Sequence, residues 1–277
     1  MVAVSVIIPT YNWSEVLRCA IKSVLDQRFG DFELLVVGDG CTDDTADVVA
    51  RAARVDGRVR WIGLPRNAGT QAVPNNAGLD LAGGPIVTYL GHDDLWLPHH
   101  LDTVVDALAQ APDAAVVHTR SCLMVPGRPP TTHPPAGYEF SPGDWLAPTT
   151  TGHRRDAVRS LGGWRTPNRS GTRDPEADLW ARVAEVHGAA VLSPRITAMK
   201  LPAASRRDVY RTRPSAEQHR WLDRIERAPD PELMLARLID VAHPIEGVAE
   251  TTPSIFSDPD ADAAERHRVR RRWKGLD

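Results

Sequence analysis

Two adjacent carboxylates, Asp93 and Asp94, are the side chains of this chain whose types and spacing most clearly indicate a site that binds a ligand or a metal. They follow an apolar run, Pro85–Leu90, that predicts a buried strand. The pair therefore lies just beyond a strand's carboxyl end, where open α/β sheets build their ligand sites. Adjacent carboxylates repel each other unless a cation or a hydrogen-bonding partner joins them. The cation could be a divalent metal that also binds a diphosphate, and the hydrogen-bonding partner could be a ribose hydroxyl. The alternative is that the two carboxylates form a solvated helix cap.

A third carboxylate, Asp39, follows another predicted strand, Phe32–Val37, and lies between two glycines that let a ligand approach the backbone closely. A carboxylate there can accept a hydrogen bond from the N3–H of a uracil or thymine ring in a partly dry pocket. Asp43 and Asp44, a few residues further on, are expected to stabilise the first turn of a helix through its dipole.

Polar residues also follow the first predicted strand, and their hydroxyl, phenol and amide groups can bracket a planar base and its ribose. They are Pro9, Thr10, Tyr11 and Asn12. An ordinary strand-to-helix connection is the alternative.

A further loop opens the helix predicted over 70–81, and the N-terminus of a helix favours anions. Arg66 could meet a phosphate there, although an exposed surface arginine is the alternative. Asn67 and Gly69 would shape the turn, and the helix itself carries Asn75.

These residues need a scaffold, and hydrophobic patterns in the first 120 residues supply one. Strands are expected at 2–8, 32–37, 59–62, 85–90 and 114–119. Helices are expected between them, at 14–27, 42–54, 70–81 and 98–110. Strands that alternate with helix-length segments predict βαβ units, and hence a mostly parallel sheet covered on both faces in an α/β fold.

Beyond residue 120 the pattern is less regular. Repeated prolines predict a long irregular segment over 125–148. Helical patterns resume at 153–161 and 176–187, and a strand-like run follows at 189–192. After residue 200 the chain is expected to be helical, with 215–227 and 231–241 as the clearest segments, and the Arg-rich tail 265–277 is expected to be a solvated terminus.

Composition excludes several classes of protein. A net charge of −3 gives no reason to expect a nucleic-acid partner. Three cysteines without metal-ligand spacing fit a reducing cytosol, and no run approaches the ~18 apolar residues that span a bilayer, so a cytoplasmic protein without a transmembrane segment is expected. The start of the chain, 1–8, resembles a first strand more than a signal peptide. Lysine occurs only at 22, 200 and 274, a bias that a GC-rich genome explains.

Four motifs occur in order: Pro-Thr-Tyr-Asn from residue 9, Gly-Asp-Gly-Cys-Thr-Asp-Asp-Thr from residue 38, Asn-x-Gly from residue 67, and Asp-Asp at 93–94. In order and spacing they closely resemble the family 2 glycosyltransferases of the GT-A fold, over roughly residues 4–190. The resemblance implies a Rossmann-like GT-A domain over 1–200 and a helical C-terminal extension over 201–277. Residues 1–120 would form the donor half and 121–200 the acceptor half.

The resemblance also implies roles. Thr10, Tyr11 and Asp39 would hold the nucleoside of a sugar nucleotide, Asp93 would contact the ribose or the donor sugar, and Asp94 would bind Mn2+ or Mg2+ bridging the diphosphate. Such a metal is a Lewis acid that stabilises charge on the departing nucleoside diphosphate. The other expected donor contacts are Pro9, Asn12, Arg66, Asn67, Gly69, Asn75 and His92.

The chain departs from the commoner family pattern at two positions. Gly38 stands where an acidic residue often precedes Asp39, and Gly91 stands where the first Asp of an Asp-x-Asp motif often lies. The second departure leaves Asp94 as the main protein ligand expected for the metal.

Family members place a catalytic base at the start of a helix that follows a Gly-Gly-aromatic turn. Here the turn ends at Trp164, and alignment on Asp178 and Arg182 puts Glu176 in the base position. Its role would be to take the proton from the acceptor hydroxyl during a single inverting displacement. Asp174 is the reserve candidate, and for both residues the alternative is an acid that complements the helix dipole.

The sequence thus predicts an inverting, metal-dependent glycosyltransferase that uses a UDP- or dTDP-sugar and a hydroxyl-bearing acceptor of unknown class. The 201–277 extension would cover the acceptor cleft or support a homodimer. Gln218–Trp221 is one residue short of the signature of processive members, so it is interpreted as part of a surface helix.

Two other functions stay open. A sugar-phosphate nucleotidyltransferase should carry a Gly-x-Gly-x-Arg loop after its first strand, which residues 9–12 do not provide. A catalytically silent nucleotide-sugar binding protein would bind a donor without turnover.

Overall fold

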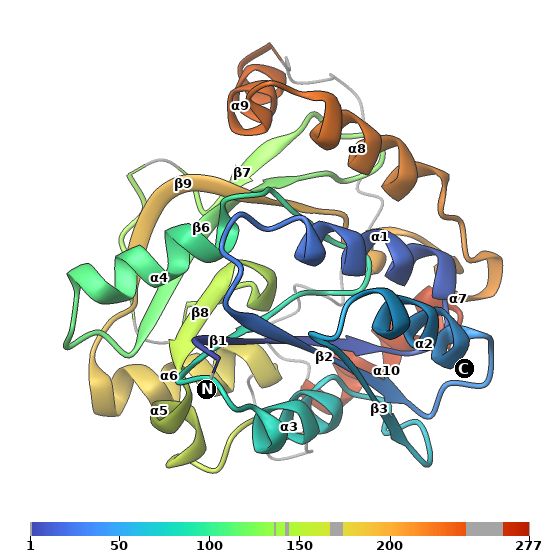
Figure 1. Ribbon diagram of the computed structural model, residues 1–277, viewed down its shortest axis with the longest axis horizontal. Coiled ribbons are helices and arrows are strands. Elements are labelled where there is room, and N and C mark those ends of the chain that lie inside the picture. Colours follow the sequence, from blue (N-terminus) through green and yellow to red (C-terminus); the bar gives the residue numbers. More distant parts are fainter. Residues whose placement is uncertain (1, 136, 142–143, 167–173, 242–262, 277) are drawn as a thin grey trace.

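A computed structural model shows a single mixed sheet covered by helices on both faces (Figure 1). It describes residues 2–135, 137–141, 144–166, 174–241 and 263–276. The strand order is β3-β2-β1-β4-β8-β6-β9-β5, and β7 pairs with β6 off this path. The expected α/β fold is therefore confirmed.

The first part of the sheet is entirely parallel, as the alternation of strands and helices predicted. Its strands are β1 (Val4–Thr10), β2 (Phe32–Asp39), β3 (Val59–Leu64) and β4 (Ile86–Tyr89). Neighbouring residues of β1 bury their side chains on opposite faces: Ile7 joins one apolar core, and Val6 and Ile8 join another. Burial on both faces explains why β1 and β2 are largely apolar instead of alternating.

The rest of the sheet is largely antiparallel. It comprises β5 (Leu95–Trp96), β6 (Val116–Leu123), β7 (Thr131–His133), β8 (Thr151–Arg154) and β9 (Val191–Lys200). Of these pairings only β6–β9 is parallel. The sequence missed three of the strands. The proline-rich segment contains β7, which pairs with β6, and the helix expected from His153 begins only at Arg155, because His153 lies in the central strand β8.

Helices pack against both faces of the sheet. One face packs against α1 (Ser14–Leu25), α2 (Thr45–Val55) and α4 (His100–Gln110). The other packs against α3 (Ala72–Leu81), α5 (Arg155–Arg159) and α6 (Pro175–His187). Short 3-10 turns, η1 (Pro148–Thr150) and η2 (Ala203–Ser205), lead into β8 and out of β9.

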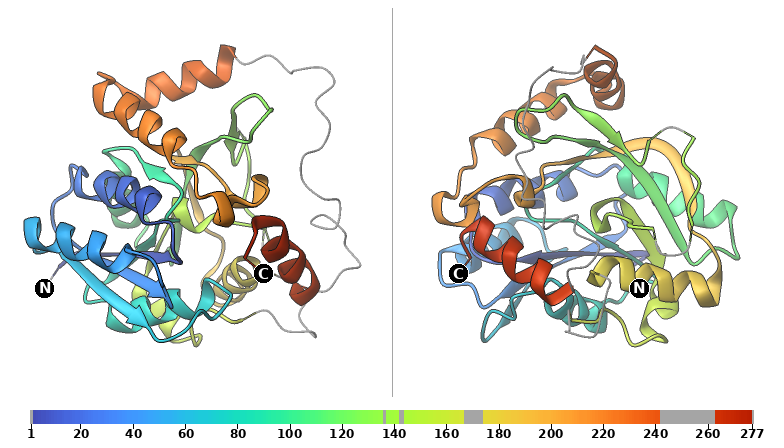
Figure 2. Two further views of the ribbon diagram at one scale, coloured as in Figure 1. Left: turned by 90° about the vertical axis from the view of Figure 1, so that its right-hand side faces the viewer. Right: turned by 180° about the vertical axis from the view of Figure 1, so that it is seen from behind.

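The C-terminal region is helical, as expected, and consists of α7 (Val209–Thr212), α8 (Ala216–Arg227), α9 (Pro231–Val241) and α10 (Ala263–Lys274). Helices α8 and α9 pack over β5 and β9 through Trp221, Leu222, Ile225 and Leu235. Helix α10 lies at a different place, beside η2 and α7 (Figure 2). The prediction of a solvated tail is therefore wrong, because α10 is ordered against the body of the protein.

Within the described part of the chain, the helices are too short or too polar to cross a bilayer.

Candidate functional site

The carboxyl ends of β2, β1 and β4 are neighbours in the sheet, as the sequence predicted. Thr10 ends β1, Asp39 ends β2, and Asp93 and Asp94 follow β4 on the next loop. Parallel strands present these ends on one edge, so the three expected motifs converge on one side of the molecule.

Asp39 is fixed by the loop that opens α3. Its Oδ1 accepts a hydrogen bond from the Ala68 N–H (2.9 Å), and its carbonyl accepts one from the Asn67 side-chain amide (3.2 Å). Gly40 allows this approach, because a Cβ on it would lie 2.3 Å from the Asn67 nitrogen and its φ is +68°. Burial raises the pKa of Asp39, and the N–H groups of Ala68 and Gly69 partly oppose this.

A steric contact explains why residue 38 is a glycine. A Cβ at this position would lie 2.0 Å from the Trp61 ring of β3, so an acidic side chain does not fit there unless Trp61 moves. The indole therefore occupies the place that the commoner family pattern gives to a carboxylate.

The first loop has a structural and a site-facing part. Asn12 is buried, and its Oδ1 accepts a hydrogen bond from the Thr42 N–H (2.8 Å), which ties the first loop to the second. Thr10 is buried beside His92, with 2.8 Å between Thr10 Oγ1 and His92 Nδ1. Pro9 and Tyr11 are half-buried at the same edge.

His92 links this edge to the C-terminal region. Its Nε2 lies 2.9 Å from the hydroxyl of Tyr210 in α7, and Trp13 packs edge-on against both rings. Burial lowers the pKa of His92, so the neutral ring is favoured. Hydrogen bonds to Thr10 and Tyr210 engage both ring nitrogens, and we therefore find no nitrogen left over for a metal.

Asp94 is fully buried and already paired. Its Oδ2 lies 2.9 Å from Lys200 Nζ and also accepts a hydrogen bond from Thr149, while its Oδ1 accepts one from the Leu201 N–H (2.8 Å). The expected role of Asp94 as the metal ligand would require Lys200 to leave. In this geometry Asp94 instead holds the end of β9 against the loop after β4.

Asp93 is the more accessible carboxylate of the pair. It is half-buried, and its Oδ2 accepts a hydrogen bond from the Ala203 N–H (2.8 Å). A Cβ on Gly91 would lie 3.0 Å from Asp93 Oδ1 and 2.9 Å from Asp94 Oδ2. Gly91 thus leaves room for both carboxylates to fold back over residue 91, and a third acidic side chain there would crowd them.

Helix α6 carries both candidate bases. Glu176 is half-buried in its first turn and accepts a hydrogen bond from the Gln71 side-chain amide at the start of α3. Burial raises the pKa of Glu176 above its usual range, and the neighbouring Asp174 adds to this effect. Asp174 is paired with Arg270 of α10, whose Nη1 lies 2.9 Å from Asp174 Oδ2.

The start of α6 is anchored by the Gly-Gly-aromatic turn. Arg182 lies 2.8 Å from the Asp178 carboxylate and donates to the carbonyls of Leu161 (3.0 Å) and Gly163 (2.7 Å). The side chain of Asn76 in α3 exchanges two hydrogen bonds with the backbone of Trp164, at 2.8 and 2.9 Å. The residues that matched the family pattern around Glu176 therefore position this helix.

Two expected donor contacts lie in contrasting environments. Arg66 is exposed. Asn75 is fully buried, and neither atom of its amide has a hydrogen-bond partner among the described residues. A buried amide without partners is costly, so a water or a ligand is needed to satisfy it.

Sequence reasoning missed the cations of this site. Lys200 is paired with Asp94, and Lys274 and Arg271 of α10 lie near Asp93 and Asp39, whose charges they influence. Two of the three lysines in the chain therefore belong to the site, a signal that codon bias appeared to explain. Gln218 was also misjudged: it is buried in α8 and donates to the carbonyl of Asp93 (3.4 Å).

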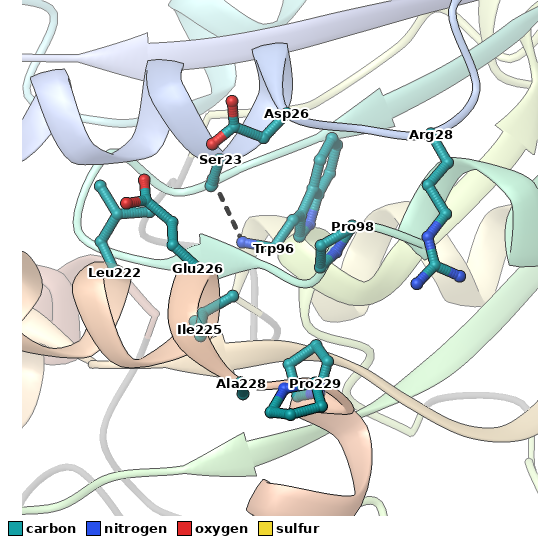
Figure 3. A pocket seen from close by; sticks show the side chains of 11 residues that line it. Ser23, Asp26, Arg28, Trp96, Pro98, Leu222, Ile225, Glu226, Ala228 and Pro229 are labelled. Carbon is teal, nitrogen blue, oxygen red and sulfur yellow. Dashed lines mark hydrogen bonds between the residues drawn. The ribbon is translucent and has the colours of Figure 1, made fainter.

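A cavity of about 260 Å³ lies elsewhere, between α1, β5 and α8 (Figure 3). Trp96, Leu222 and Ile225 form its apolar wall, and Asp26 and Glu226 at its rim both pair with Lys22. Because its carboxylates are already paired with a lysine, this cavity lacks the chemistry of the sheet edge.

The chain resembles known proteins in sequence over its N-terminal part. The family described as Glycosyl transferase family 2 matches residues 5–158. An uncharacterized glycosyltransferase of Nostoc sp. is 36% identical over 116 residues, or 42% of this chain and 35% of the relative. The GalNAc(5)-diNAcBac-PP-undecaprenol beta-1,3-glucosyltransferase of Campylobacter jejuni is 39% identical over 108 residues, or 38% of this chain and 34% of the relative. The matches thus span little more than a third of these relatives.

Solved structures share the fold more widely. Staphylococcus aureus TarS covers 86% of this chain and 69% of its own, with a TM-score of 0.55 and 19% identity. The mannosyltransferase PcManGT of Pyrobaculum calidifontis, in complex with GDP-Man and Mn2+, covers 85% and 68%, with a TM-score of 0.57 and 21% identity. At such identities the likeness establishes the fold.

Proposed function

Since the chain belongs to glycosyltransferase family 2, we propose that it transfers a sugar from a nucleoside-diphosphate donor to an acceptor hydroxyl with inversion. The observation that carries this proposal is the convergence of Asp39 and Asp93 on one edge of the sheet, with Glu176 hydrogen-bonded to Gln71 at the start of α3. Burial lowers the pKa of Lys200, but the charges of Asp94, Asp93 and Glu176 outweigh it, so these carboxylates share one electrostatic environment.

On the donor side, Asp39 would accept the N3–H of a uracil or thymine base, which favours a UDP- or dTDP-sugar. Tyr11 and Thr10 would border the base and ribose, and Asn75 would supply an amide that the protein leaves unpaired. A fold neighbour, TarS, has been solved with UDP-GlcNAc, which supports a nucleotide-sugar site in this scaffold.

The described residues would hold Mn2+ or Mg2+ only together with the donor diphosphate. Among the described residues there is no group of three His, Cys, Asp or Glu side chains that could hold a metal ion. Asp94 is committed to Lys200, which leaves Asp93 as the carboxylate that would hold the ion. Magnesium commonly binds one or two carboxylates plus substrate phosphates, so an ion held mainly by the donor diphosphate is compatible with this site. When bound, it would neutralise charge on the leaving diphosphate.

Glu176 is the better of the two base candidates. Asp174 is already engaged by Arg270, whereas burial raises the pKa of Glu176. A raised pKa makes a carboxylate a stronger acceptor for a hydroxyl proton. Glu176 would take that proton as the acceptor oxygen attacks the anomeric carbon from the face opposite the diphosphate, and this single displacement inverts the configuration.

The acceptor would bind in the half formed by residues 121–200. The protein would act in the cytoplasm on a hydroxyl-bearing acceptor, as a monomer or a homodimer.

The experiment that tests this function is calorimetric titration of the protein with UDP, dTDP, GDP, ADP and CMP, each with and without Mn2+. We expect metal-enhanced binding of UDP or dTDP that is lost in Asp39→Ala. Asp44→Ala is the matched control, because Asp44 is exposed on the same loop. Absence of nucleotide binding, or binding that ignores both Asp39 and metal, would contradict the proposal.

Donor turnover then separates an enzyme from a silent nucleotide-sugar binding protein. Hydrolysis of the sugar nucleotide without acceptor, measured by release of the free sugar, supports a transferase. Binding with no turnover in any donor supports the silent binder.

A further inference from the structure

Helix α10 turns a basic face toward the proposed donor site. His267, Arg270, Arg271 and Lys274 are half-buried and follow helical spacing on one side, whereas Arg268 and Arg272 are exposed on the other. Helices normally bury their apolar face. A helix that buries its cations instead needs negative charge opposite them.

Contacts place this face over the loops that were expected to bind the nucleotide. His267 is hydrogen-bonded to the carbonyl of Gly69, and a Cβ on Gly69 would lie 3.1 Å from the Arg271 guanidinium. The charge of Arg271 also reaches Asp39, whose pKa it lowers against the effect of burial. The C-terminal end of α10 is held by the Asp208 N–H, which donates to the carbonyl of Trp273 (2.8 Å).

Lys274 lies beside Tyr210, near Asp93. Its ammonium is 5.7 Å from the centre of the Tyr210 ring, which itself contacts His92 beside Asp93. Burial lowers the pKa of Lys274, while the carboxylates of Asp93 and Glu176 oppose this effect. Asp94 is paired with Lys200 and Asp174 with Arg270, while Arg271 lies near Gly69 and Asp39 and Lys274 lies near Asp93.

We propose that α10 is part of the donor site and that Lys274 and Arg271 bind the diphosphate of the donor. This inference rests on the proposed function, because it requires a nucleoside diphosphate between Asp39 and Asp93. Because residue 91 is a glycine and not an acid, the site has only one available carboxylate to bind a metal. The two cations of α10 would compensate by supplying positive charge directly to the phosphates.

A rival arrangement uses the same contacts. Helix α10 would then be a plug whose cations only neutralise the empty site, and a donor would have to displace it. The two arrangements predict opposite signs, because removing a ligand cation weakens diphosphate binding and removing a plug contact strengthens it.

The test is calorimetry on the full-length chain with UDP, UMP and uridine, or with the dTDP series if the wild type prefers thymine. Lys274→Gln should weaken UDP binding about ten- to hundredfold, the loss expected for one charge-assisted contact, and leave uridine binding within about twofold. Lys274→Arg keeps the charge and should retain most of the affinity. Arg272→Gln is the matched control, since it removes one charge from the exposed side of the same helix.

The outcomes separate this inference from the proposed function. A wild-type protein that binds none of the nucleotides overturns both. A wild type that binds UDP, with Lys274→Gln equal to Arg272→Gln, overturns the inference alone. Tighter UDP binding in Lys274→Gln would show that α10 is a plug. An equal loss of affinity for uridine and UDP would show that α10 only shapes the pocket. Either result overturns the inference that Lys274 binds the diphosphate.

Discussion

The two sides of the proposed donor site are built in different ways. The floor comes from β1, β2 and β4, whose carboxyl ends carry Thr10, Asp39 and Asp93 within the first 94 residues. The closing side comes from Lys200, Tyr210 and α10, more than 100 residues later in the chain. The floor follows from strand order, whereas the closing side determines which carboxylates are neutralised. Two sites with the same strand ends could therefore differ in net charge and in how strongly they require a metal ion.

Asp93 and Asp94 show the difference on adjacent residues. Asp94 is fully buried and paired with Lys200 from the closing side, and Asp93 is half-buried, with a charge that raises the pKa of Lys274. In this structure Asp94 has a lysine partner, whereas Asp93 accepts a hydrogen bond from the backbone N–H of Ala203. The sequence-based assignment of the metal to Asp94 did not anticipate this division.

The largest effect is expected at the proposed base, which lies between floor and closing side. Glu176→Gln should lower kcat about 10²- to 10⁴-fold, the usual contribution of a general base, and leave the donor Kd nearly unchanged. Initial rates and calorimetry on the same variant measure the two effects. If Asp174→Asn produces the larger loss of kcat, the base is Asp174 and the assignment of Glu176 is wrong.

The buried pair gives the largest effect on stability. Asp94→Asn leaves the Lys200 ammonium without its partner, which should lower the free energy of unfolding by about 3–5 kcal/mol. Asp93→Asn should cost much less, because Asp93 is half-buried, but should weaken metal-dependent UDP binding. Urea unfolding and calorimetry distinguish the two. The double variant Asp94→Asn, Lys200→Met should recover stability, and a failure to do so would show that Lys200 is not the cause.

The pH dependence of activity sharpens the role of Glu176. A base must be deprotonated to act, and burial raises the pKa of Glu176 above the ordinary 4.5 of a glutamate. As pH falls through this raised pKa, kcat/KM should fall about tenfold per pH unit. The acid limb of the profile should therefore lie above pH 4.5 in the wild type and be absent from the residual activity of Glu176→Gln. An unchanged limb in the variant would assign it to another group.

Asn75 of α3 tests whether a buried polar group lowers the stability of the fold in order to bind the donor. Replacement by Leu, which has a similar shape, removes an unpaired buried amide and should stabilise the fold by about 1–3 kcal/mol. The same change should weaken donor binding if the amide is a ligand. Thermal unfolding with and without UDP measures both, and Asn75→Leu that is destabilised would mean that water already satisfies the amide.

The smallest effect concerns the link between the two sides. Tyr210→Phe removes the hydrogen bond to His92 while keeping the ring contacts with Trp13, so it should cost about 1 kcal/mol. Urea unfolding measures this cost. A loss of UDP affinity beyond about twofold would show that Tyr210 also positions the site.

Much of this arrangement was predictable for local reasons. The alternation of apolar runs and amphipathic helices predicted β1 to β4 with errors of a few residues, and strand ends placed Thr10, Asp39 and Asp93 together. The short strands β5, β7 and β8 were missed because two to four residues carry too little periodicity, and β8 pairs residues that are distant in sequence. Pro134 directly after β7 also masked that strand.

Other features could not be predicted because they depend on tertiary contacts. Nothing near Asp94 in sequence indicates that Lys200 will neutralise it, and an Arg-rich tail has the composition of a solvated terminus. Gln218 and Trp221 of α8 are buried although their neighbours are polar, since one helix face packs against Asp93 and β5.

The sequence alone determined the fold class, the family and the edge of the sheet that carries the site, because strand periodicity and turn residues are local properties. The tertiary structure decided which of the two carboxylates is paired with a lysine and where the last helix lies. Those outcomes depend on electrostatic pairing between residues more than 100 positions apart, such as Asp94 with Lys200, and such pairing exists only once the chain has folded.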